Sequence, residues 1–181
     1  MIPSIVALFP STVFPEPVAT GCAALVGGPL KPLQCVYYAF LLTMLPVGVK
    51  ITMKIVAGAS APPADQIDAN VDPRAGDRKR VATDPTYARV SAIESHMYEA
   101  VGFTGLALAV LVALQAGVSE GAVAIYATSY LVSKAAWMAF YMASLPQFVG
   151  KGFAGVFGVA RTCSFLASEA CVATLLQLAA R

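Results

Sequence analysis

Long stretches without any charged residue constrain this chain more than any other feature of its sequence. From Ala100 to Ser119 there are 20 consecutive residues without a charge, and Ala135 to Gly150 gives another 16. In helical form, runs near 20 apolar residues match the hydrocarbon thickness of a bilayer. The composition agrees, since 58% of the 181 residues are hydrophobic and only 12% are charged. The sequence therefore predicts an all-α integral membrane protein.

Four transmembrane helices are predicted, over residues of about 32–56, 86–116, 121–144 and 153–180. The links between the last three are short, so these helices should be antiparallel neighbours in one bundle. A long polar loop, residues 58–85, separates the first span from the second. Residues 1–30 form a Pro-rich apolar arm, because proline interrupts helices and makes a full span unfavourable there. The chain thus divides into an arm and a four-helix membrane domain, residues 31–181.

Basic residues are distributed unevenly between the two ends of these spans. Eight belong to the side of the long loop: Lys50, Lys54, Arg74, Arg78, Lys79, Arg80, Arg89 and Lys151. The opposite side has Lys31 and Arg181. The positive-inside rule places the long loop of this multi-pass protein in the cytoplasm, or in the matrix or stroma of an organelle. The sequence has no run of basic residues interleaved with aromatic residues, the pattern that would suggest nucleic-acid binding.

Several ionisable residues fall inside the predicted spans, where an isolated charge costs roughly 2.5–3.5 kcal/mol on insertion scales. Counted from the basic side, Glu99 lies about as deep as Lys134, and Glu94 about as deep as Arg161. These matching depths predict two ion pairs, Glu99 with Lys134 and Glu94 with Arg161. Glu169, near the middle of the fourth span, receives no partner from this count. Such pairs serve either to fix the register of the helices or to build a functional site.

Helical spacing places polar and aromatic side chains on two stripes that should face each other. The stripes consist of Arg89, His96 and Glu99 in the second span and of Lys134, Trp137 and Tyr141 in the third. We expect them to meet in a buried pocket on the basic side. His96 is the only histidine of the chain, which excludes a multi-histidine metal or haem site. No metal is expected.

Three segments together resemble a known family of membrane proteins. Residues 83–99, TDPTYARVSAIESHMYE, resemble the helix-two signature of the MAPEG family, the membrane-associated proteins of eicosanoid and glutathione metabolism. The pattern Lys134-x-x-Trp137-x-x-x-Tyr141 stands where that family has an arginine followed by aromatics. SLPQFVGKGFAGVFG, residues 144–158, is similar to its link into helix four. The microsomal glutathione transferase branch is the most similar.

The resemblance implies a MAPEG-like four-helix bundle that forms a homotrimer and binds glutathione between neighbouring subunits. The glutathione-binding residues that it implies are Arg89, His96, Glu99, Lys134, Trp137 and Tyr141. In the family, an arginine near the end of helix three stabilises the reactive thiolate. Lys151 is the cation nearest to that position and is therefore the candidate catalytic residue.

This chain departs from the family pattern at two arginine positions. Ala92 stands where a second helix-two arginine is usual, and residues 148–150, FVG, occupy the place of the thiolate-assisting arginine. Without a neighbouring cation, the pKa of a thiol stays at about 8.5, which leaves little nucleophile at neutral pH. Lysine is also a poor substitute for the bidentate grip of arginine on a carboxylate.

Two main interpretations of function follow, with a third, less favoured one. The chain is either a non-catalytic MAPEG-like structural subunit of a larger membrane assembly, with its arm contacting another membrane subunit, or a working enzyme. The enzyme would be a glutathione transferase or peroxidase acting on lipophilic electrophiles or hydroperoxides. A small transporter or proton relay, using the glutamates and His96, is the third interpretation.

Overall fold

The computed structural model describes residues 14–58, 84–99, 102–143 and 154–181, leaving aside the side chains of residues 54, 57, 58, 98, 99, 154 and 155. Over these residues every regular element is a helix. The helices are α2 (Glu16–Ala24), α3 (Pro32–Gly58), α5 (Pro85–Glu99), α6 (Phe103–Gln115), α7 (Glu120–Ala143) and α8 (Ala154–Ala179). The predicted all-α class is confirmed for this part of the chain.

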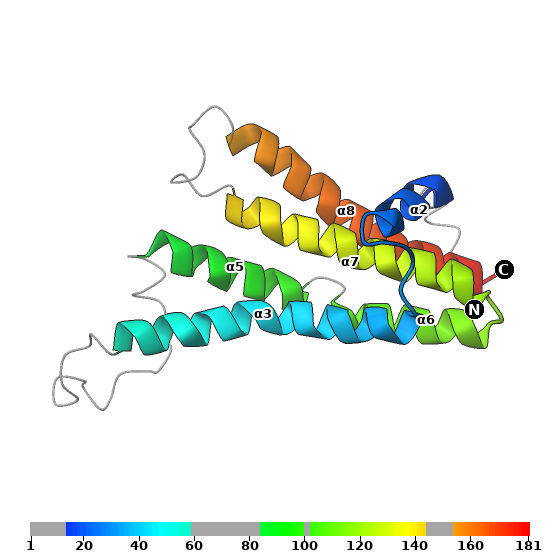
Figure 1. Ribbon diagram of the computed structural model, residues 1–181, viewed down its shortest axis with the longest axis horizontal. Coiled ribbons are helices and arrows are strands. Elements are labelled where there is room, and N and C mark those ends of the chain that lie inside the picture. The colour runs from blue at the N-terminus through cyan, green and yellow to red at the C-terminus, as the bar shows by residue number, and fades with distance from the viewer. Residues whose placement is uncertain (1–13, 59–83, 100–101, 144–153) are drawn as a thin grey trace.

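The long helices run side by side along the longest axis of the molecule, as Figure 1 shows. α7 is the central element, because it packs against α2, α3, α5, α6 and α8. More than half of its 24 residues are buried, including Thr128, Ser129, Ser133 and Lys134. A helix with this much polar burial must find partners for those groups within the protein.

The second predicted span is not one continuous helix, so that prediction was wrong in this respect. α5 ends at Glu99, and α6 begins at Phe103 after Gly102, whose φ of −76° and ψ of −162° are extended. Glycine favours a helix interior less than alanine does by about 1 kcal/mol, so the apolar run is weakest as a helix here. α5 and α6 have 15 and 13 residues, and each alone is shorter than the roughly 20 residues that cross a bilayer.

Two described helices are long and apolar enough to cross a membrane, judged by length and composition. They are Pro32–Met53 within α3 and Val156–Ala179 within α8. Within the most apolar 18 residues of each helix only 22% and 28% are buried inside the chain, so much of both helices is left accessible to their surroundings. A core helix of a soluble protein would instead be mostly buried.

The outer surface of α3 is strongly apolar along its whole length. Leu33 is 69% exposed near its start, Leu45 is 54% exposed in its middle, and Ile55 is 67% exposed near its end. Polar groups are buried on α7 while large apolar groups are exposed on α3, which reverses the usual distribution of a water-soluble protein. An apolar surface of this extent requires an apolar environment or a partner.

The described part of the N-terminal arm, residues 14–30, packs on the chain's own helices. Three hydrogen bonds fix it there. The Ser129 hydroxyl donates to the Ala19 carbonyl at 2.7 Å, and the Leu30 N–H donates to Thr128 Oγ1 at 2.8 Å. The Phe14 N–H donates to Thr174 Oγ1 of α8, also at 2.8 Å. The arm therefore supplies partners for the polar side chains that α7 and α8 bury at this end.

We expect Thr128→Val to lower the free energy of unfolding by about 1–3 kcal/mol, because it leaves the Leu30 N–H without its acceptor at nearly constant side-chain volume. Unfolding in detergent, followed by circular dichroism, measures the loss, and hydrogen exchange should become faster at the Leu30 amide. Thr162→Val is the matched control, since that threonine is exposed and its hydroxyl bonds only within its own helix. Equal stability of the two variants would contradict the role of Thr128.

Candidate functional site

Three helices bring a cluster of cationic and aromatic side chains together at one end of α7. Each helix contributes residues that share one face: Arg89 and His96 from α5, Lys134, Trp137 and Tyr141 from α7, and Arg161, Phe165 and Glu169 from α8. We call this group the cation–aromatic cluster. It lies toward the end of α7 that is remote from α2, in the part of the molecule where α8 begins (Figure 1).

In the outer half of the cluster, the part toward the end of α7, side chains of all three helices contact Tyr141. The guanidinium carbon of Arg161 lies 4.8 Å from the centre of its ring, and that of Arg89 lies 5.3 Å away. The rings of Trp137 and His96 are 5.5 Å and 6.0 Å from the same ring. Cations within about 6 Å of an aromatic ring are attracted by its quadrupole. Two guanidinium groups from different helices thus converge on one buried tyrosine.

Lys134 occupies the inner half of the cluster and is almost completely buried, with 1% of its surface exposed. Its ammonium lies 3.0 Å from Glu169 Oε1 and 4.7 Å from the centre of the Phe165 ring. The rings of Tyr130 and Trp137 lie within 6 Å as well. The charge is therefore balanced by one carboxylate and surrounded by aromatic faces.

Counting residues along each predicted span assigned no partner to Glu169, whereas the structure pairs it with Lys134. The count along each helix assumed that neighbouring helices begin at the same level and that a charge sits at the level of its Cα atom. A lysine side chain instead carries its ammonium well away from its own turn. The side chain of Glu99, the predicted partner of Lys134, lies outside the described residues, as does Lys151.

The predicted pair of Glu94 with Arg161 was wrong. Glu94 bonds to Lys50 of α3, with 2.5 Å between the carboxylate oxygen and the ammonium nitrogen. Arg161 instead lies against Tyr141. The physical reason is rotation about the helix axis: Glu94 lies on the face of α5 away from Arg89 and His96, and α5 packs against α3 there. Two residues at equal depth in their helices lie at the same level of the bundle, but they need not lie on helix faces that meet.

The two predicted stripes do come together, but His96 is exposed and not buried as expected. Five of the predicted residues contact one another within the cluster: Arg89, His96, Lys134, Trp137 and Tyr141. The sequence interpretation missed the contribution of α8, although the spacing of Arg161, Phe165 and Glu169 at i, i+4 and i+8 marks one helical face. Among the described residues, no group of three or more His, Cys, Asp or Glu side chains is placed to hold a metal ion.

Chemically, the outer half of the cluster suits an anion. The described carboxylates of α5 and α8, Glu94 and Glu169, are each bonded to a lysine. The guanidinium groups of Arg89 and Arg161 make cation–π contacts with Tyr141. Neither guanidinium forms an ion pair with a described carboxylate. Arginine presents its N–H donors in a planar fork that matches carboxylate and phosphate groups.

Comparisons of this chain with protein-family models, with curated proteins and with solved structures found no match.

We expect Lys134→Met to lower the free energy of unfolding by about 3 kcal/mol, because Glu169 then keeps a partly buried charge without a partner. The double variant Lys134→Met with Glu169→Leu should regain most of this loss, since an apolar pair can replace a buried ion pair at little cost. Denaturant unfolding in detergent measures both, with Cys163→Ala at an exposed position of α8 as the control. Equal losses in the single and double variants would contradict coupling between the two charges.

Proposed function

We propose that this chain is a MAPEG-like, four-span membrane protein whose glutathione site is degenerate, and that it serves as a non-catalytic structural subunit of a larger membrane assembly. The proposal joins the sequence resemblance to two features of the structure. One is the outward apolar surface, and the other is the internal use of the lysine that the resemblance assigns to the ligand.

The reversed distribution of polarity supports the membrane part of the proposal. In a bilayer, the exposed faces of α3 and α8 would contact acyl chains, and the polar residues of α7 would stay inside the bundle. α5 and α6 would together form the second span, with their interruption at Gly102. A break in a transmembrane helix is tolerated where the freed backbone groups are covered by neighbouring helices. Both segments pack against α3 and α7.

The ion pair of Lys134 with Glu169 is the observation that supports a non-catalytic function. The resemblance assigns this residue to the peptide ligand, yet its ammonium is bonded to Glu169 and enclosed by rings. Binding a carboxylate there would require that pair to break inside a low-dielectric interior, which is costly. The missing arginines at Ala92 and at residues 148–150 point in the same direction. The fixed charges thus hold helices together instead of holding a substrate.

A glutathione transferase or peroxidase is the alternative function, and the arrangement of Arg89 and Arg161 favours it. Two guanidinium groups beside Tyr141 could hold the carboxylates of a tripeptide. Under this alternative, Lys151 would take the place of the missing arginine and lower the pKa of the bound thiol.

The oligomeric proposal also rests on the apolar face of α3. A homotrimer, as the resemblance implies, or contact with other membrane subunits would cover part of the surface around Leu33, Leu45 and Ile55. Lipid would cover the remainder.

Calorimetry with glutathione on the purified, detergent-solubilised protein tests the choice between the two functions. We expect no heat of binding up to millimolar glutathione and no conjugation of a chlorinated nitrobenzene. Binding in the micromolar-to-millimolar range would contradict the proposal. Conjugation that Lys151→Ala abolishes, and that Lys31→Ala at the other end of the chain leaves unchanged, would establish the alternative.

The membrane orientation is testable on its own with trypsin. We expect the protein, expressed in a bacterial inner membrane, to resist extraction by alkaline carbonate. Cleavage within residues 58–85, which contain Arg78, Lys79 and Arg80, should occur in inverted vesicles and not in spheroplasts. Release by carbonate would refute the membrane assignment, and cleavage in spheroplasts would reverse the orientation.

A further inference from the structure

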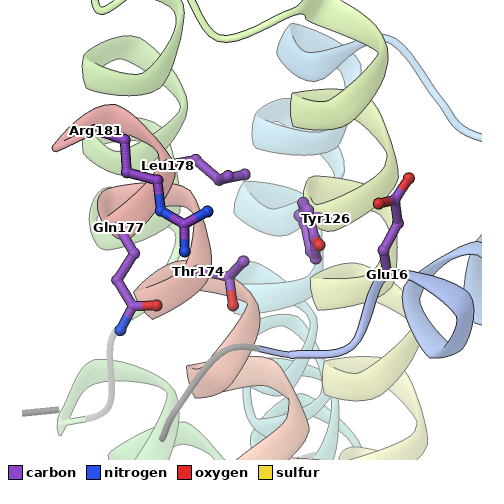
Figure 2. Close-up of a pocket in the computed structure, with 6 residues that line it drawn as sticks. All are labelled: Glu16, Tyr126, Thr174, Gln177, Leu178 and Arg181. Carbon is purple, nitrogen blue, oxygen red and sulfur yellow. The ribbon is translucent and has the colours of Figure 1, made fainter. Parts of the chain in front are cut away.

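A second candidate site lies at the opposite end of the molecule from the cation–aromatic cluster. It is a cavity of about 230 Å³ where the start of α2, the first half of α7 and the last turns of α8 meet (Figure 2). The residues that line it are Glu16, Tyr126, Thr174, Gln177, Leu178 and Arg181. None of them belongs to the proposed glutathione site, so the two sites are independent.

The rim of this cavity carries one charge of each sign on opposite sides. In Figure 2, Arg181 extends from the α8 side and Glu16 stands across the cavity on α2. Both side chains are exposed, and neither forms an ion pair with the other or with another described residue. Two opposite charges that stay apart across a gap leave room for a ligand that carries both.

The floor of the cavity is largely buried and hydrogen-bonded. Thr174 is 1% exposed, and its hydroxyl accepts the Phe14 N–H and donates to the Ala170 carbonyl. Tyr126 is 6% exposed and presents a ring between the two charged side chains (Figure 2). An aromatic face beside a carboxylate is a favourable environment for an organic cation. The cation of a ligand would therefore lie toward Glu16 and Tyr126, and its anion toward Arg181.

The volume limits the size of the ligand. Pockets for drug-sized molecules usually enclose about 300–1,000 Å³, so a cavity of about 230 Å³ suits a smaller group. Exposed apolar side chains are close in sequence to lining residues: Val18 comes two residues after Glu16, and Leu176 is next to Gln177. A ligand with a small zwitterionic head and an apolar tail matches both features.

We propose that this cavity binds a phosphoethanolamine group, with its phosphate on Arg181 and its primary ammonium on Glu16. The source that the lining residue Leu178 and the exposed apolar side chains of Val18 and Leu176 favour is the head group of an ethanolamine phospholipid, whose acyl chains would run along the outside of the bundle. The primary ammonium donates hydrogen bonds to a carboxylate, which a quaternary choline does not. A glycerol head group carries no cation for Glu16 at all.

Native mass spectrometry of the full chain in detergent, with one phospholipid class added at a time, tests the proposal. We expect phosphatidylethanolamine to be retained at least five-fold more than phosphatidylcholine or phosphatidylglycerol. Glu16→Gln should remove this preference, and Arg181→Gln should lower the retention of all three lipids. Lys31→Gln and Glu120→Gln, two exposed charges elsewhere in the chain, are the matched controls and should change nothing.

Two further arms separate the alternatives. Soluble phosphoethanolamine that competes only far above the lipid concentration identifies the lipid as the source, whereas equal competition identifies the free zwitterion bound by the same two charges. Equal retention of the three lipids by the unaltered protein, or unchanged selectivity in Glu16→Gln with its helicity intact, would overturn the proposal. Circular dichroism of each variant shows that the helices are retained.

Discussion

The buried ion pair between Lys134 and Glu169 is the interaction on which the rest of this structure depends. It joins α7, the central helix, to α8, and the Lys134 ammonium is enclosed by aromatic rings while Glu169 is partly buried. A lone charge in such surroundings would be strongly unfavourable, so each group requires the other. The pair therefore favours the axial offset and rotation at which Lys134 of α7 meets Glu169 of α8, and Tyr141 and Arg161 meet along the same two helix faces.

The two ends of the molecule on either side of this pair differ in character. At the end where α8 begins, cations from two helices converge on Tyr141 and create an environment for anions. At the other end, the N-terminal arm closes over α7 and leaves a small cavity between Glu16 and Arg181. The arm provides hydrogen-bond partners for the Thr128 and Ser129 hydroxyl groups of α7, the second of which also donates to the Ile125 carbonyl of its own helix. Thus α7 can be polar inside while its neighbours are apolar outside.

Much of the candidate site could be predicted because helical periodicity is a local property. The spacing of Lys134, Trp137 and Tyr141 assigns them to one face whatever surrounds the helix, and the same holds for Arg89 and His96. The third helix of the site escaped prediction, although Arg161 and Glu169 were recognised as charges within a span. Depth along a helix is one coordinate, whereas pairing also depends on rotation and on the reach of a flexible side chain.

The sequence by itself determined the helical class, the positions of α3, α7 and α8, and the two stripes that meet in the cluster. Composition and short-range spacing are sufficient for these, because each helix satisfies its own backbone hydrogen bonds. Only the tertiary structure decided that Lys134 bonds to Glu169, that Glu94 bonds to Lys50, and that the arm lies on α7. These choices depend on the axial offsets and rotations of packed helices, which no single segment of the chain encodes.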